Sequence, residues 1–211
     1  MSKPLSPLAA VLSLLAATPA MAFGNDDYAC ENCELFPYSR FRMQVGGGRT
    51  VTQGWAAQYL DNGANFGLGF TWQPTAKEPI ALRVDGMYQS FDARPLLLTQ
   101  AAASLGTNVD EATVKMWGGD IDAELDLRVS YEARLYLLVG GGWYDQQNNF
   151  RYRGTLVSRN TTGPHFEKNA GVGMEFANGG TIFLFIDVRY MRFDVNGQKL
   201  DLIPIRLGLR F

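Results

Sequence analysis

Apolar residues alternate with polar or small residues through most of the chain from Pro37 onward, and this two-residue period constrains the fold most strongly. The clearest stretch is 117–127, where apolar residues occupy one face of the predicted strand. The acidic residues Asp120, Asp122, Glu124 and Asp126 occupy the other face. A period of two places side chains of one kind on one face of a β-strand. The chain is therefore predicted to be all-β.

Eight segments carry this alternation, which predicts an eight-stranded antiparallel up-and-down barrel. They lie near residues 39–47, 64–73, 80–92, 114–127, 134–145, 164–176, 181–193 and 200–211. The connections alternate in length: 74–79, 128–133 and 177–180 are short, whereas 48–63, 93–113 and 146–163 are long. Short turns at one end and long loops at the other are typical of transmembrane β-barrels. With an even number of strands, both ends of the barrel chain should lie at the short-turn end.

Charges on the polar face are nearly balanced, and the positive ones are all arginine. Arginine is favoured over lysine for buried, bidentate pairing with carboxylates. An eight-stranded barrel has an interior just wide enough for side chains to fill, so paired charges would close it. We therefore expect a lumen charge network of Arg83, Asp85, Asp120, Asp122, Glu124, Asp126, Arg134, Glu175, Asp187, Arg189, Arg206 and Arg210. The same face carries Arg40, Arg42 and Glu167.

The apolar face carries aromatic residues near the strand ends, where outer-membrane barrels have aromatic girdles. These residues are Trp72, Tyr88, Trp117, Trp143, Phe176, Tyr190 and Phe211. A soluble, lipocalin-like barrel would reverse the two faces, with the apolar face inward and the charges in water. The loop asymmetry, the girdles and an export signal together favour the membrane barrel.

The first residues have the features of a cleavable signal peptide. Lys3 is followed by an apolar run at 8–17, and Ala20-Met21-Ala22 gives the small-x-small pattern before a cleavage between Ala22 and Phe23. The apolar run is too short to span a bilayer as a helix, and no later stretch approaches the ~20 residues required. The predicted organisation is a signal peptide at 1–22, a periplasmic segment at 23–37 and a barrel at 38–211. With 19 basic and 21 acidic residues, the chain offers no reason to expect nucleic acid as a partner.

Cys30 and Cys33 are the only cysteines, and both lie in the segment before the barrel. In an oxidising periplasm we expect them to form a local disulfide, with free or metal-bound thiols as the alternative. Glu34 follows Cys33 where haem attachment would need a histidine, so no haem is expected.

The last three segments resemble the closing half of the OmpA/OmpX/opacity-like family of small outer-membrane barrels. The resemblance rests on Gly171–Phe176, Phe185–Tyr190 and Pro204–Phe211. It implies an outer-membrane location with periplasmic termini, and a role for Phe211 as the signal for the barrel-assembly machinery. Members of this family include anchors, adhesins and host-factor binders, so the resemblance implies fold and location better than activity.

Three motifs have a superficial likeness to catalytic or binding sites, and each lacks a required residue. Some small outer-membrane barrels are lipid A deacylases with a His-x-Ser pair, but Glu167 stands two residues after His165, the only histidine. The acidic strip at 120–126 lacks the glycine of a calcium loop, and Gly140–Gly142 lacks the Lys-Ser/Thr of a phosphate loop. We therefore predict no catalytic, metal-binding or cofactor-binding residue and no cofactor.

The sequence thus favours a non-enzymatic outer-membrane barrel that displays extracellular loops for envelope integrity, adhesion or surface binding. The alternatives are a lipid-modifying enzyme, a small pore and a soluble periplasmic barrel. The expected partners are outer-membrane lipid, the barrel-assembly machinery and an extracellular ligand bound by the long loops. The predicted loop at 93–113 is unusually apolar, which suits a short helix at the mouth, a partner-binding element or packing against other loops.

Overall fold

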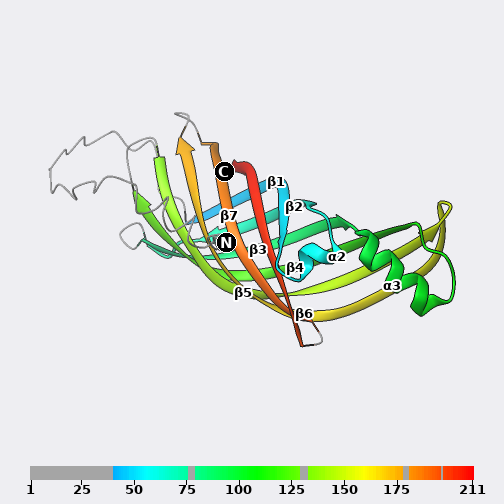
Figure 1. The fold of residues 1–211 in the computed structure, drawn as a ribbon. Coiled ribbons are helices and arrows are strands. Elements are labelled where there is room, and N and C mark those ends of the chain that lie inside the picture. The colour runs from blue at the N-terminus through cyan, green and yellow to red at the C-terminus, as the bar shows by residue number, and fades with distance from the viewer. Residues whose placement is uncertain (1–39, 76–78, 129–132, 178–180, 196) are drawn as a thin grey trace, which may run out of the picture. The chain divides into compact units, whose positions relative to one another are not determined.

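The structure is a computed structural model that describes residues 40–75, 79–128, 133–177, 181–195 and 197–211. Its eight antiparallel strands form a closed barrel, in which each strand pairs with the next and β8 closes against β1 (Figure 1). The predicted fold class is confirmed. The signal-peptide prediction, with its cleavage between Ala22 and Phe23, and the predicted Cys30–Cys33 disulfide lie outside the described residues.

The elements follow one another in the order expected for an up-and-down barrel. The strands are β1 (Phe41–Gln53), β2 (Gly63–Trp72), β3 (Ile80–Asp92), β4 (Glu111–Arg128), β5 (Ala133–Tyr152), β6 (Thr155–Ala177), β7 (Phe183–Val195) and β8 (Gln198–Arg210). Two helices interrupt this order: α2 (Ala56–Tyr59) lies between β1 and β2, and α3 (Pro95–Leu105) lies between β3 and β4.

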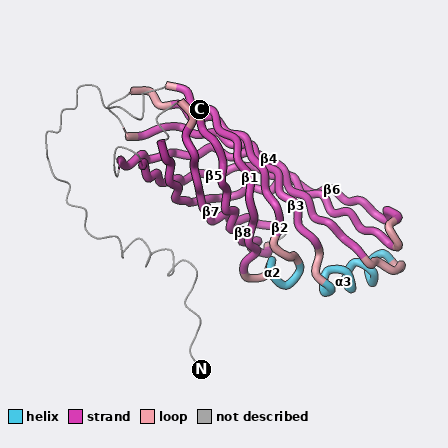
Figure 2. The backbone as a smooth tube through the Cα atoms, turned by 90° about the horizontal axis from the view of Figure 1, so that it is seen from above, coloured by secondary structure: helices cyan, strands magenta, loops and turns pink. Residues whose placement is uncertain are grey.

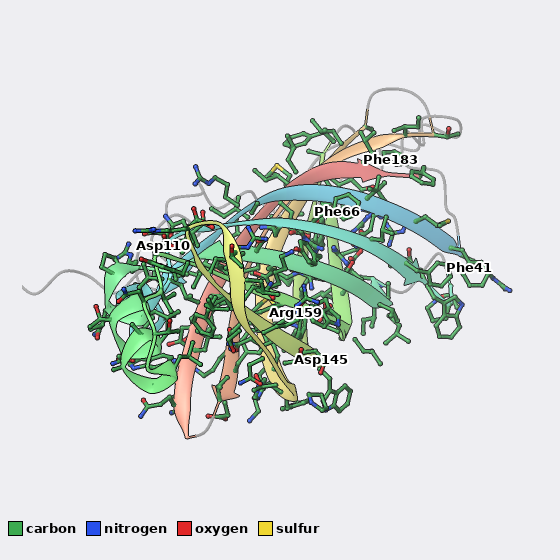
Figure 3. The ribbon with its side chains drawn as sticks, turned by 90° about the vertical axis from the view of Figure 1, so that its right-hand side faces the viewer. Phe41, Phe66, Asp110, Asp145, Arg159 and Phe183 are labelled. Carbon is green, nitrogen blue, oxygen red and sulfur yellow. The ribbon has the colours of Figure 1, made fainter. Side chains whose placement is uncertain are left out.

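The two ends of the barrel differ. The connections β2–β3, β4–β5 and β6–β7 share one end, here called the short-turn end. β1 begins and β8 finishes at this end, where the backbone N–H of Phe211 donates to Met43 O at 2.9 Å. The helices α2 and α3 lie at the opposite end, here called the mouth, away from the C-terminus (Figure 2). In Figure 3, Phe41 and Asp110 mark the short-turn end and the mouth.

Two of the predicted long loops are wrong, because strands continue through them. β1 runs on to Gln53, and β5 and β6 extend as a hairpin through 146–163, past the other strands (Figure 1). The hairpin turns at Arg153 and Gly154, both with positive φ, as a tight two-residue hairpin requires. This segment does not alternate because polar residues occupy both of its faces. The backbone hydrogen bonds that pair the two strands do not require alternating side chains, so the strands can continue through this segment.

The helix α3 occupies most of the predicted loop at 93–113. Pro95 at its first position and Gly106, in the left-handed conformation at its end, are favourable start and stop residues. The backbone N–H of Arg94 donates to Tyr59 O at 2.8 Å, and its side chain pairs with Asp61 at 2.7 Å. These contacts tie the start of α3 to α2. Within the described part of the chain, no helix is long and apolar enough to cross a membrane.

The barrel is charged inside and apolar outside. Arg83 and Arg189 point inward and are completely buried, whereas the outward-facing Leu68 and Val139 are 58% and 61% exposed. Leu138, Phe183 and Phe185 fall on the charged face in the sequence pattern, and all three are buried in the interior. Exposed apolar side chains cover the outer surface of the barrel wall, as a lipid-facing surface requires.

Candidate functional site

The half of the lumen nearer the short-turn end is filled by ionisable side chains. Among the described residues, six arginines and eight carboxylates are buried. All twelve residues expected in the lumen charge network are buried there, together with Arg42 and Glu167. Arg40, which shares their face in the sequence pattern, is exposed ahead of β1.

The layer nearest the short-turn end contains three positive and three negative side chains. They are Arg42, Arg134, Arg210, Glu124, Asp126 and Glu175. Glu124 lies at its centre: its oxygens accept hydrogen bonds from Arg210 at 3.0 and 3.1 Å and from Arg42 at 3.3 Å. Arg134 pairs with Asp126 at 3.2 Å and also with Glu175. Charge within this layer is balanced, which is the condition under which buried ions are tolerated.

Aromatic rings lie against two arginines of the network, Arg210 of this layer and Arg83 of the next. The Arg210 guanidinium carbon lies 4.9 Å from the centre of the Tyr136 ring and 5.8 Å from that of Phe185. The Arg83 guanidinium carbon also lies over Tyr136, at 5.7 Å from the ring centre. A cation stacked on an aromatic face gains electrostatic attraction without needing a further anion.

The next layer toward the mouth joins three arginines to four aspartates. Its members are Arg83, Arg189, Arg206, Asp85, Asp120, Asp122 and Asp187. Arg83 links the two layers, because it donates to Asp85 at 2.8 Å, to Asp187 at 3.0 Å and to Glu124 at 3.3 Å. Arg189 donates to Asp122 at 2.8 Å and to Asp120 at 3.0 Å and pairs with Asp85. The pairs come from β3, β4, β7 and β8, so the network crosses the lumen and joins opposite walls.

Carboxyl groups outnumber arginines beside β6. Glu167 is completely buried, and it forms no ion pair with an arginine among the described residues. The register explains its position: Gly142 of β5 lies between Asp120 of β4 and Glu167 of β6. Because Gly142 has no side chain, nothing from β5 separates the two carboxylates. A Cβ at Gly142 would collide with the backbone of Gly119 and Asp120.

The half of the lumen nearer the mouth is closed by an apolar plug, which the alternating sequence pattern does not predict. Its buried members are Ala56, Leu60, Met87, Phe91, Val114, Met116, Tyr144, Met191, Phe193, Leu200 and Leu202. Tyr144 connects the plug to the charges, because its hydroxyl donates to Asp120 Oδ2 at 2.7 Å and its ring packs edge-on against Phe193. The sequence contains one indication of the plug: Met87, Met116 and Met191 are apolar residues at inward-facing positions.

A cavity of about 150 Å³ lies above the plug at the mouth. It is lined by Trp55, Tyr59, Leu60, Leu97, Gln100, Val114, Gln146, Asn148, Phe150, Val195 and Leu200. These residues come from α2 and its flanks, α3, and the mouth ends of β4, β5, β7 and β8. The lining is mostly apolar and aromatic, with the amides of Gln146 and Asn148 on the hairpin side and that of Gln100 on α3.

Comparison with known proteins shows what this architecture is. No protein-family model and no curated protein matches the chain. Among solved structures, Neisserial surface protein A matches with a TM-score of 0.55 and 12% identity, over 82% of this chain and 96% of that one. The chain has the fold of the small outer-membrane β-barrels. A major outer membrane protein from Thermus thermophilus also matches, with a TM-score of 0.51 and 8% identity, over 82% of this chain and 99% of that one.

The alternative of a lipid-modifying enzyme makes the environment of His165 relevant. The outer membrane enzyme PagL matches with a TM-score of 0.39 and 16% identity, over 81% of this chain and 98% of that one. His165 lies on β6, and its Nε2 is 3.5 Å from Thr162 Oγ1. Among the described residues, no hydrogen bond joins this ring to a serine or a carboxylate. A hydrolase of the Ser-His-acid type needs both contacts.

Proposed function

We propose that this protein is a non-enzymatic outer-membrane barrel that anchors an external platform, built from the β5–β6 hairpin, α2 and α3, for binding at the cell surface. The observation that carries this proposal is the division of the molecule along its axis. A wall with an apolar outer surface surrounds a lumen closed by ion pairs and an apolar plug, and an ordered polar hairpin extends past the wall. The termini would then face the periplasm and the mouth would face outward, as in other barrels with short turns at one end.

The extended hairpin has the surface expected outside a membrane. Up to Trp143, the outward face of β5 is apolar, and from Asp145 onward it is polar. Trp143 packs against Phe166 of β6 at 5.4 Å, which places an aromatic pair at this boundary. Beyond it, the polar side chains pair across the hairpin, as in the 3.1 Å hydrogen bond from Arg159 to Asn149. A membrane interface favours aromatic residues at the boundary and polar residues, such as these amides, in the water beyond it.

The closed lumen predicts that the protein conducts no ions. Purified protein inserted into a planar lipid bilayer should show no stable open channel, because the charged layers and the plug leave no continuous aqueous path. Fractionation of cells should recover the protein with the outer membrane, and a deletion strain should have an unchanged lipid A profile. A long-lived conducting state would contradict the closed lumen, and a changed lipid A acyl pattern would favour the enzyme.

Deleting Phe211 should reduce insertion into the outer membrane. Phe211 exchanges two backbone hydrogen bonds with Met43, at 2.7 and 2.9 Å, and these help to close β8 onto β1. Its exposed ring is also the terminal aromatic residue that we propose the barrel-assembly machinery recognises. The measurement is the fraction of heat-modifiable barrel in the outer membrane, with Phe211→Tyr as the conservative control. Equal insertion of the deleted and the intact chain would rule out this role for Phe211.

A further inference from the structure

The mouth cavity has a composition suited to a small neutral ligand. Its floor is formed by Leu60, Val114 and Leu200, which also belong to the plug, so the cavity does not continue into the lumen. No residue that lines it carries a full charge. A charged ligand would therefore lose its hydration without gaining a partner ion, which is costly. A neutral molecule does not incur that cost.

The volume of the cavity sets the size of the ligand. A cavity of about 150 Å³ is large enough to hold a solute the size of benzene. Here the cavity has that volume, and Trp55, Tyr59 and Phe150 contribute aromatic surface to it. The rings of Trp55 and Tyr59 are packed together, with their centroids 4.6 Å apart. A flat aromatic ring fits both the volume and this surface.

The amides on the hairpin side give the cavity a polar edge. Gln146 Nε2 donates to Asn148 Oδ1 at 2.9 Å, which fixes the two amides relative to each other. This hydrogen bond leaves the Gln146 carbonyl oxygen as an acceptor and the Asn148 amide N–H groups as donors. Ligand pockets commonly combine an apolar lining with a few polar groups that orient the ligand. One hydroxyl or N–H group on the ring would find a partner here.

Contacts of Arg94 join the two helices that line the cavity. Arg94 joins the start of α3 to α2 through its backbone bond to Tyr59 and its side-chain pair with Asp61. These contacts hold Leu97 and Gln100 of α3 beside the residues of α2 that line the cavity. A site already formed before binding has less conformational entropy to lose.

From this geometry we propose that the mouth cavity binds a small neutral aromatic molecule that carries one hydrogen-bonding group. The ring lies among Trp55, Tyr59 and Phe150, and its polar substituent meets Gln146 and Asn148. This inference rests on the proposed function only in that the mouth faces the external medium. Binding itself is a property of the purified barrel.

Phenol is the probe, and it is titrated against the full barrel in lipid nanodiscs, with binding followed by calorimetry and by ligand-observed NMR. Binding should saturate, and benzoate should bind at least about tenfold more weakly because its charge has no partner in the cavity. Val195→Phe, which adds a ring where Val195 lines the cavity, should weaken phenol binding by about tenfold or more. The matched control is Leu105→Phe, an exposed position on α3 outside the cavity, and it should leave binding unchanged.

The polar edge is tested separately with Gln146→Leu. This variant should lose the preference for phenol over benzene while still binding benzene. Non-saturating uptake equal to that of empty nanodiscs, or phenol binding unaffected by Val195→Phe in a protein that still folds, would overturn the proposal. Folding of each variant is checked by its heat-modifiable mobility. The outer-membrane location is tested in cells, so its failure would be seen independently of ligand binding.

Discussion

Replacing Glu124 by glutamine should lower the free energy of unfolding by about 3–5 kcal/mol, the cost of removing one partner from a buried ion pair. Glu124 is completely buried and accepts hydrogen bonds from Arg42, Arg83 and Arg210. Glutamine keeps the size of the side chain but removes its charge, and its amide N–H groups would face guanidinium donors. The change therefore leaves the arginines of the layer nearest the short-turn end with two carboxylates in place of three. Urea unfolding of the barrel in lipid vesicles measures the loss.

Glu167→Gln is the matched control for Glu124→Gln, because it makes the same chemical change at a carboxylate with the opposite surroundings. Glu167 pairs with no arginine among the described residues and faces Asp120 across Gly142. Glutamine carries no charge at any pH, so the variant has neither repulsion with Asp120 nor the cost of burying an unpaired charge, and stability should stay the same or rise. A similar loss of stability in both variants would contradict this prediction. It would mean that the stability of the barrel does not depend on the specific ion pairs of Glu124.

The composition of the lumen could be predicted from the sequence because strand geometry is strictly periodic. Once the apolar face is assigned to lipid, every second residue has to point inward, and an inward charge must find a counter-ion. The position of a residue in this alternation is enough to place Arg83 and Asp122 in the lumen. It does not identify their contact partners, because alternation shows which face a residue is on but not which residue of the neighbouring strand lies beside it.

The difference between Glu124 and Glu167 shows what the register adds. In the sequence both are acidic residues on an inward face. In the barrel, Glu124 meets arginines from β1, β3 and β8, whereas Glu167 lies across Gly142 from Asp120 and pairs with no arginine among the described residues. Three arginines that are distant in the sequence converge on one carboxylate only after all eight strands have paired. No local pattern contains that information.

The mouth was harder to predict than the wall for a physical reason. The plug uses apolar residues on the inward face, such as Met116 and Phe193, which weakens the alternation where the lumen changes from charged to apolar. The β5–β6 extension has polar residues on both faces, so its sequence has no period of two. In each case the pattern disappears because the environment on the two faces of the strand becomes similar.

Replacing Val139 by arginine should destabilise the barrel in a bilayer by about 2–4 kcal/mol, the cost found for arginine on the lipid face near the membrane midplane. Val139 points outward and is 61% exposed. It lies midway along the apolar part of β5, between Leu135 and the boundary residue Trp143. An arginine there cannot reach either interface without distorting the lipid around it.

Val157→Arg is the control for this prediction, because Val157 is 40% exposed on the hairpin beyond the apolar wall. Water surrounds that position in the proposed orientation, so the substitution should change stability by no more than about 0.5 kcal/mol. A barrel that worked in water would give a different pair of results. Val139 would then be an ordinary surface residue, and both substitutions would be nearly neutral. Exposure alone does not distinguish lipid from water, but the cost of placing a charge at the position does. Equal and small effects of the two substitutions in lipid vesicles would therefore contradict the membrane assignment. Complete folding of the wild-type chain without lipid or detergent would contradict it as well.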